Sequence, residues 1–317
     1  MPELKLERVR GCGFFTGAYQ SVGQWSDPWT SSVTRSSWVF QPQRSLTKRR
    51  RKQPLRRAAA CRLTTPLDRI VRWRSSALLP PAHLRIYYGT WNPDAFARHC
   101  DITRAELVTR GLRPEHRVLD IGSGIGNLAI GLRDYLHGYD GLEIRPEAVA
   151  WCQRAITPRH PSFRFHRADL ASRAYNPRGT VSAAEYRFPF PDQSFDVIFL
   201  ASVFTQMLPD AVAHYLQEIS RLLAPGGMCV ASFFLLNGQT RAGVDAGRSF
   251  MSLSVQHLSK LCRLHDATVP EAAVALEEEF VRRVCGQTGL AIRDVRRGRW
   301  WSGERHDQDV VTLVCEH

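Results

Sequence analysis

The sequence predicts an α/β protein built on a doubly wound, mostly parallel seven-stranded sheet with helices on both faces. From about residue 83, short apolar runs alternate with amphipathic stretches, as expected of successive βαβ units. The first apolar run ends in three glycines spaced two apart, Gly122, Gly124 and Gly126. Folds of this class bind ligands at the carboxyl ends of their first strands, so the sequence places a ligand site at this turn.

Seven apolar runs define the expected strands, and three amphipathic stretches between them define the first helices. The strands are expected at 117–121, 139–144, 162–168, 195–200, 227–236, 290–297 and 309–315, and the helices at 125–136, 146–157 and 210–223. Pro146 and Pro209 stand in the first turn of the second and third helices, where proline is tolerated. The sequence "PGG" at 225–227 is expected to end the third helix, and a longer helix is expected over 270–284.

The residues around the glycine turn argue against a ligand that presents a phosphate to it. Dinucleotide-binding folds use G-x-G-x-x-G, whereas this turn reads G-x-G-x-G followed by Asn127, and the Gly-Lys-Ser/Thr of a phosphate loop is not found. Asp120 directly precedes the turn, and its carboxylate would repel a pyrophosphate. It suits a ligand that is cationic at this point, such as one with an ammonium group.

Two further acids follow the next two expected strands. Glu143 lies 17 positions after Gly126, where a carboxylate can accept hydrogen bonds from both ribose hydroxyls. Asp169 ends the third expected strand and can accept from an adenine amino group, with Leu170 against the ring. A cationic amino-acid end, a ribose and an adenine without a phosphate together describe S-adenosylmethionine.

These motifs resemble those of class I S-adenosylmethionine-dependent methyltransferases. The stretch "VLDIGSGIGN" is similar to the family's first motif, and "FPFPDQSFDVIFLASVF" at 188–204 and "EISRLLAPGGMCVASFF" at 218–234 resemble its fourth and fifth strands. The resemblance covers roughly residues 84 to 315. It implies a Rossmann-like sheet with an antiparallel last strand, methyl transfer from S-adenosylmethionine, and cofactor contacts from Ser123 and Ser202 beside the residues named above.

A narrower resemblance is to an uncharacterised bacterial subgroup of type 11-like methyltransferases. It rests on "WCQRAI" (151–156), "AYNPRG" (174–179), "SVFTQMLP" (202–209), "HYLQEI" (214–219) and a tail that contains Gly298, Trp300, Gln308 and Asp309. These relatives usually have a histidine where this chain has Gln206. Glutamine can orient a hydroxyl but cannot take its proton, so Gln206 is the candidate substrate-orienting residue and no catalytic base is named.

Several kinds of methyl acceptor are disfavoured by the residues after the fourth strand. The stretch "LASVF" differs from the Asn/Asp-Pro-Pro-aromatic motif typical of adenine or amine methylation in nucleic acids, and the chain has no Pro-Cys for cytosine methylation. "ASVFTQM" offers no acid for a metal ion, so no metal is expected. By elimination, we expect a hydroxyl of a small molecule, lipid or sugar as the acceptor. The segment 237–268 is an insertion expected to act as a substrate lid, and 85–96 is expected to fold over the cofactor.

The charge of the chain is concentrated in its first part. The net charge is +13, but residues 1–82 hold 16 Lys and Arg against 4 Asp and Glu, whereas residues 83–317 hold 27 against 26. Because like-charge runs such as "TKRRRKQPLRR" usually stay solvated, residues 1–82 are expected to be a basic, disordered arm and 83–317 a methyltransferase domain. The arm leaves open an RNA methyltransferase tethered by it, and a module that binds S-adenosylmethionine without catalysis is a further alternative.

The eight cysteines show neither C-x-x-C pairs nor zinc-ligand spacing, which is typical of free thiols in a reducing compartment. The first residues lack a signal-peptide pattern, and no long apolar run without charges predicts a membrane span. A cytoplasmic protein is therefore expected.

Overall fold

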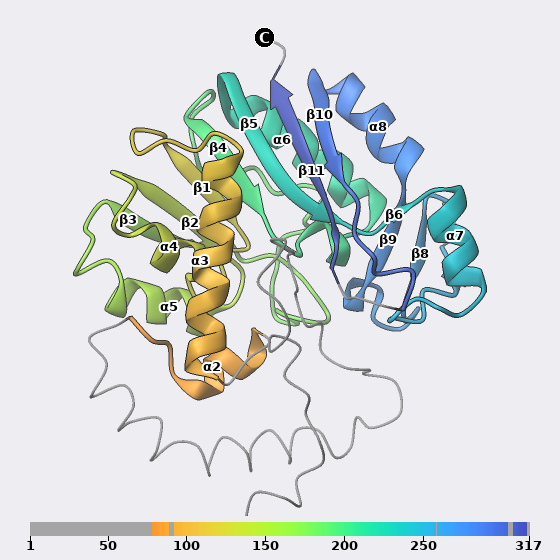
Figure 1. Cartoon of the computed structure of the whole chain (residues 1–317), viewed down its shortest axis with the longest axis horizontal. Coiled ribbons are helices and arrows are strands. Elements are labelled where there is room, and N and C mark those ends of the chain that lie inside the picture. Colours follow the sequence, from red (N-terminus) through yellow and green to blue (C-terminus); the bar gives the residue numbers. More distant parts are fainter. Residues whose placement is uncertain (1–77, 89–91, 258, 304–306, 316–317) are drawn as a thin grey trace, which may run out of the picture. The chain divides into compact units, whose positions relative to one another are not determined.

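The computed structural model describes residues 78–317 apart from 89–91, 258, 304–306 and 316–317. Its main sheet has seven strands in the order β10-β11-β5-β4-β1-β2-β3 (Figure 1). The strands span β1 Val118–Ile121, β2 Tyr139–Glu143, β3 Phe163–Arg167, β4 Phe195–Leu200, β5 Leu223–Phe233, β10 Leu290–Arg296 and β11 Asp309–Cys315. β11 alone runs in the direction opposite to the other six strands, so the predicted fold class is confirmed.

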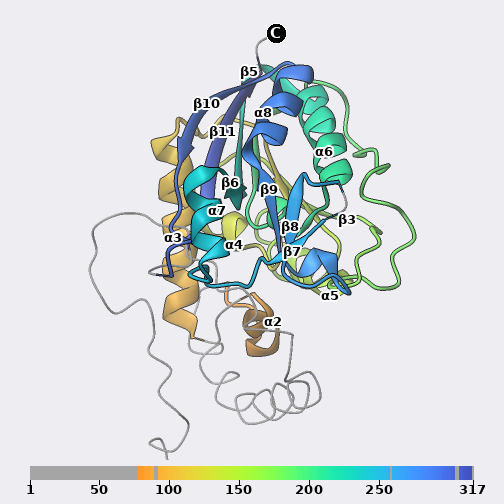
Figure 2. The same cartoon turned by 90° about the vertical axis from the view of Figure 1, so that its right-hand side faces the viewer.

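The helices of the described residues are α2 Ala82–Tyr87, α3 Pro93–Thr109, α4 Asn127–Leu132, α5 Pro146–Ala155, α6 Pro209–Leu222, α7 Gly238–Asp245 and α8 Glu278–Gln287. Helices α3 and α6 lie on opposite sides of the main sheet (Figure 2). Two core clusters fill the two faces, one packed with α3, α4 and α5 and the other with α6 and α8. None of these helices combines the length and the apolar character that a membrane span needs.

Successive side chains of the central strands pack alternately into the two core clusters. In β4, Val197 and Phe199 belong to the cluster with α3 to α5, whereas Ile198 and Leu200 belong to the cluster with α6 and α8. Side chains of a strand point to opposite faces in turn, and both faces of a parallel sheet are covered. The uninterrupted apolar run of this strand is therefore the pattern that its two-sided burial requires.

A second, four-stranded sheet in the order β6-β9-β8-β7 follows β5 in the chain. Its strands are β6 Leu235–Leu236, β7 Val255–Gln256, β8 Cys262–Leu264 and β9 Val274–Glu277. The apolar run expected as one strand over 227–236 is thus divided between two sheets, and 237–268 contains α7, β7 and β8.

The prediction of a helix over 270–284 is wrong for the first half of that range. Residues Pro270–Ala272 form a 3-10 turn, η2, and β9 follows before α8 begins at Glu278. Val274 and Leu276 are buried and pair with β8, and Leu276 also pairs with Leu235 of β6. Pairing on both sides of this strand outweighs the helical preference of its alanine, leucine and glutamate. The "PGG" prediction also needs correction, because α6 already ends at Leu222 and residues 225–227 lie within β5.

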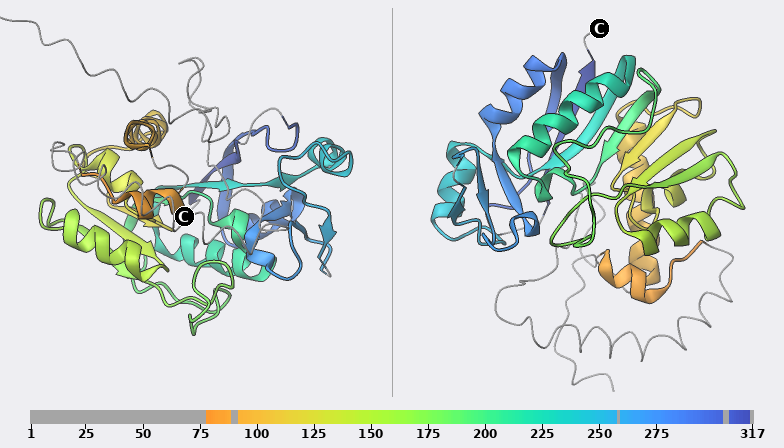
Figure 3. Two further views of the ribbon diagram at one scale, coloured as in Figure 1. Left: turned by 90° about the horizontal axis from the view of Figure 1, so that it is seen from below. Right: turned by 180° about the vertical axis from the view of Figure 1, so that it is seen from behind.

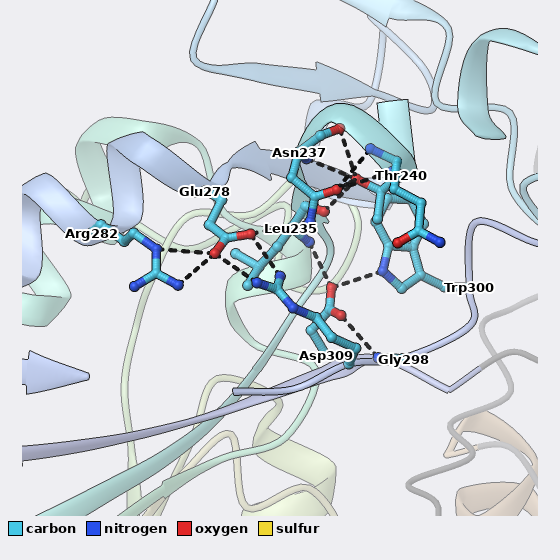
Figure 4. A network of polar contacts seen from close by, with 10 residues as sticks. Leu235, Asn237, Thr240, Glu278, Arg282, Gly298, Trp300 and Asp309 are labelled. Atoms are coloured by element: carbon cyan, nitrogen blue, oxygen red, sulfur yellow. Dashed lines mark hydrogen bonds and ion pairs between the residues drawn. The ribbon is translucent and has the colours of Figure 1, made fainter. Parts of the chain in front are cut away.

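The tail residues singled out in the sequence join the two sheets. Asp309, at the start of β11, accepts hydrogen bonds from the Leu235 amide at 2.9 Å, the Trp300 Nε1 at 2.8 Å and the Gly298 amide at 2.9 Å (Figure 4). Burial raises the pKa of Asp309 to about 6, although these three donors oppose the shift. Since Leu235 begins β6, this buried carboxylate joins the second sheet to strand β11 of the main one.

The predicted boundary between arm and domain falls near the start of the described residues. Residues 1–77 of the expected arm lie outside the described part of the chain. Leu78 and Leu79 pack against the core cluster of α3 to α5, and α2 begins at Ala82. The described end of the expected arm therefore lies against the domain.

Candidate functional site

The glycine turn after β1 is shaped so that only glycine fits. Gly122, Gly124 and Gly126 have φ angles of +79°, +55° and +78°, values that side chains rarely adopt. A Cβ atom would lie 2.5 Å from Val203 Cγ2 at the first glycine and 2.6 Å from Tyr88 Cε1 at the second. The end of β4 and helix α2 thus close on the turn from two sides, and any side chain added there would displace one of them.

Glu143 ends β2, the expected second strand, and lies directly beside this turn. Its Oε2 accepts a hydrogen bond from the Gly124 amide at 2.9 Å, and its Oε1 accepts one from the Arg145 amide at 2.9 Å. Burial raises the pKa of Glu143, although both amides oppose the shift. Each carboxylate oxygen has two lone pairs, so both oxygens keep the capacity to accept a ribose hydroxyl.

Asp120 lies at the carboxyl end of β1 and is buried. The hydroxyl of Tyr139 donates a hydrogen bond to its Oδ2 at 2.5 Å. Burial raises the pKa of Asp120 to about 7, and the nearby charge of Glu143 adds to the shift, against the opposing Tyr139 hydrogen bond. A cationic ligand group beside it would restore its ionised form, which is consistent with the expected ammonium contact.

Asp169 and Leu170 follow β3, next to Ala168, whose amide donates to the Glu143 carbonyl at 3.0 Å. The Asp169 carboxylate accepts from Thr180 Oγ1 at 3.0 Å and from Arg167 Nη2 at 2.8 Å, and the Thr180 hydrogen bond is the largest cause that lowers its pKa. Among the described residues, its hydrogen bonds go to its own strand and loop rather than to the glycine turn. Leu170 is buried and pairs with Val181.

Ser202 is held rigidly past the end of β4. Its φ of +60° is unusual for a residue other than glycine. The Ser202 amide donates to Ser232 Oγ at 2.7 Å, and its hydroxyl contacts the Gln308 side-chain amide, with Nε2 at 2.9 Å and Oε1 at 3.2 Å. The tail residue Gln308 therefore fixes the chain segment that leads from β4 to Gln206.

Gln206 ends the 3-10 turn η1, Phe204–Gln206, and is partly buried. No hydrogen bond of its side-chain amide is found within the described part of the chain. Helix α6 begins shortly afterwards, at Pro209, and no side-chain hydrogen bond caps its N-terminus within the described residues. The amide of Gln206 is thus not used to cap this helix.

Sequence reasoning missed two polar residues at the turn, Tyr88 and Asn127. Tyr88 Oη, Asn127 Oδ1 and the predicted Ser123 Oγ are all buried without a hydrogen-bond partner in the described structure. The Tyr88 ring lies against Gly124, and the Arg145 guanidinium lies 5.7 Å from its centroid. Tyr88 lies within 85–96, the segment expected to fold over the cofactor, and that expectation could have pointed to it. Unpartnered buried polar atoms around a glycine cradle fit a ligand with several polar groups, such as S-adenosylmethionine.

The described residues contain no group of three or more His, Cys, Asp and Glu side chains that could hold a metal ion.

Part of the chain matches a known family of domains. Residues 119–231 match the family model described as "Methyltransferase domain". The matched segment runs from β1 to β5 and contains the glycine turn, Glu143, Asp169 and Gln206. The predicted methyltransferase domain is therefore confirmed for residues 119–231, while the bacterial subgroup stays a prediction.

The chain is 31% identical over 120 residues to the demethylmenaquinone methyltransferase of Thermus thermophilus, covering 37% of this chain and 47% of that protein. It is 25% identical over 130 residues to the tRNA N(3)-cytidine methyltransferase METTL2 of Mus musculus, covering 41% of this chain and 31% of that protein. The chain thus spans less than half the length of these two curated relatives.

Among solved structures, it is similar to a SAM-dependent methyltransferase from Methanosarcina mazei, with 19% identity and a TM-score of 0.46 over 66% of this chain and 96% of the other. It is also similar to the 1,6-didemethyltoxoflavin-N1-methyltransferase of Burkholderia thailandensis, with 18% identity and a TM-score of 0.44 over 88% and 95%. Both TM-scores are low, so the fold assignment rests on the strand order of this chain.

Proposed function

We propose that this protein transfers a methyl group from S-adenosylmethionine to a hydroxyl of a small molecule, lipid or sugar. The observation that supports it most is the arrangement of the glycine turn. There Glu143 accepts a hydrogen bond from the Gly124 amide, and Asp120 is buried nearby. Both acids lie within the segment that matches a methyltransferase domain. The elimination of other acceptors in the sequence supports the hydroxyl.

The cofactor would be held by side chains of three strand ends. Asp120 would face the ammonium group, Glu143 the ribose, and Asp169 with Leu170 the adenine. Ser123 and Ser202 would contact the cofactor near the turn. S-adenosylmethionine supplies a methyl group already activated on a positive sulfur, so the protein has to orient the acceptor and exclude water.

The acceptor side of the site would be covered by the second sheet and α7. Gln206, whose amide has no hydrogen bond within the described residues, would orient the acceptor hydroxyl from η1. The expected cytoplasmic location fits a reaction of this kind but remains a prediction.

The experiment that tests this function has two stages. Calorimetry with S-adenosylmethionine and with NAD measures which cofactor binds; tighter binding of NAD would refute the proposal. S-adenosylmethionine with a labelled methyl group is then incubated with the protein and a host-cell extract, and the label is followed through size fractions. Label in the small-molecule or lipid fraction supports the proposal, whereas binding without any transfer would favour a non-catalytic module.

A second candidate is RNA methylation. It is favoured by the similarity to a tRNA methyltransferase and by the excess of Lys and Arg in residues 1–82. Label recovered in RNA, together with RNA binding by the full chain that weakens steeply as salt increases, would support this candidate over a small-molecule acceptor.

A further inference from the structure

The loop between β8 and β9, residues 265–273, carries a histidine whose tautomer the structure defines. His265 continues the hairpin, because its amide donates to the Ala273 carbonyl at 3.0 Å. Its Nδ1 lies 2.9 Å from the Ser252 carbonyl oxygen. A carbonyl oxygen can only accept, so Nδ1 carries the hydrogen and Nε2 of the neutral ring is a bare acceptor. This Nε2 is buried and has no hydrogen-bond partner in the described structure.

The same loop contains a second unpartnered acceptor. Glu271 lies in η2, and its Oε2 is buried without a hydrogen bond to any described residue. A buried carboxylate oxygen or imidazole nitrogen that lacks a donor is costly, and native structures leave few such atoms. Two of them in one nine-residue loop indicate that the loop receives donors from a bound molecule.

The loop lies between the two segments that flank the proposed cofactor site. Turn η2 packs against η1, which ends in Gln206. Arg173, in the segment after β3 that contains Asp169, donates from its Nη1 to the Thr268 carbonyl at 3.2 Å. The second sheet lies at the same end of the main sheet as α2, the helix that closes on the glycine turn (Figure 3). The loop thus reaches the ligand-binding edge of the sheet.

We propose that the 265–273 loop forms the acceptor site, with His265 as the general base and Glu271 as a second acceptor of hydrogen bonds from the substrate. This inference rests on the proposed methyltransferase function. It also assigns a residue to the role of general base, which the side chain of Gln206 cannot fill. The substrate it specifies is a molecule with a methylatable hydroxyl and at least one further O–H or N–H donor.

The proton balance of the step follows from the tautomer of His265. As the hydroxyl oxygen bonds to the methyl carbon, the bond from that carbon to the sulfonium breaks and leaves a neutral thioether. The hydroxyl proton passes to His265 Nε2, so the positive charge lost by sulfur appears on the imidazole. Glu271 accepts a hydrogen bond from the second O–H or N–H group of the substrate and so keeps the hydroxyl aligned for the transfer.

The test compares two variants with two matched controls. His265→Gln and Glu271→Gln remove the proposed functions. His137→Gln changes an exposed histidine that precedes β2, at the opposite end of that strand from Glu143, and Glu279→Gln changes an exposed residue of α8. Each protein is assayed for its initial rate of methyl transfer from labelled S-adenosylmethionine into the extract fraction that the unaltered protein labels, for S-adenosylmethionine affinity and for melting temperature.

We expect His265→Gln to lower the rate by about 100-fold or more, the usual effect of losing a general base, while cofactor affinity and melting temperature stay the same. Glu271→Gln should lower the rate less, and both controls should retain it. Full activity of His265→Gln, or a loss of rate that accompanies a loss of melting temperature, would overturn this inference and leave the proposed methyltransferase function standing. Cofactor binding without transfer by the unaltered protein would instead overturn the proposed function, and this inference with it.

Discussion

Asp120→Asn tests the electrostatics of the site directly. The substitution keeps the size of the side chain and an oxygen that can accept the Tyr139 hydroxyl, and it removes only the ability to ionise. Burial raises the pKa of Asp120 from its ordinary value of 3.8 to about 7. Folding therefore favours the protonated form, so the contribution of Asp120 to stability is complete below about pH 4. It is lost progressively as the pH rises to about 7.

The size of the effect follows from this shift. One pH unit between the two pKa values changes the free energy of unfolding by about 1.4 kcal/mol. Between pH 5 and pH 8, the protein should lose about 3 kcal/mol relative to the Asp120→Asn variant, because most of the loss accumulates between pH 5 and 7 and the folded state is largely ionised by pH 8. Glu143 also titrates with a raised pKa, but it is present in both proteins and largely cancels in the difference.

The assay is urea unfolding of both proteins at pH 5, 6, 7 and 8, repeated with S-adenosylmethionine. We expect the stability of the unaltered protein to fall more steeply with pH than that of the variant. If the cofactor's ammonium group contacts Asp120, the cofactor should stabilise the unaltered protein more than the variant at pH 8. Parallel pH profiles without cofactor would refute the buried, raised pKa, and equal stabilisation by the cofactor would refute the ammonium contact.

Three further predictions concern the cofactor, the acceptor and the arm. Glu143→Ala should weaken S-adenosylmethionine binding by about 1.5–3 kcal/mol, the range for hydrogen bonds to a charged group, and unchanged affinity of the folded variant in calorimetry would contradict its role. Gln206→Ala should lower methyl transfer at unchanged cofactor affinity, and Gln206→His should retain activity; a fall in melting temperature rather than in turnover would indicate a structural role. Deletion of residues 1–70 should leave both melting temperature and cofactor affinity nearly unchanged, and a large loss of either would show that this segment packs on the domain.

The strand pattern and the glycine turn were readable from the sequence because both depend on local residue type. A strand such as β4, buried on both faces, needs a continuous apolar run, and a backbone with φ above +50° favours glycine. The position of Glu143 follows from these elements, since a residue that ends a parallel strand lies at the ligand-binding edge.

The second sheet could not be predicted in this way. Residues 274–277 have good helix formers on both sides, and they form β9 only because β8 and β6 pair with them. The pairing partners lie up to about 40 positions away in the chain, and local preference is weak compared with such tertiary contacts.

The sequence by itself determined the strands of the main sheet, the helices between the first of them, the glycine cradle and the identity of its acids, because each is encoded in a short stretch of residue types. Only the tertiary structure decided how these groups are charged and held. The burial of Asp120 against Tyr139, the contact of Tyr88 with Gly124, and the fixing of Ser202 by Gln308 join distant parts of the chain. Such contacts exist only once the sheet edges meet, so no local pattern in the sequence contains them.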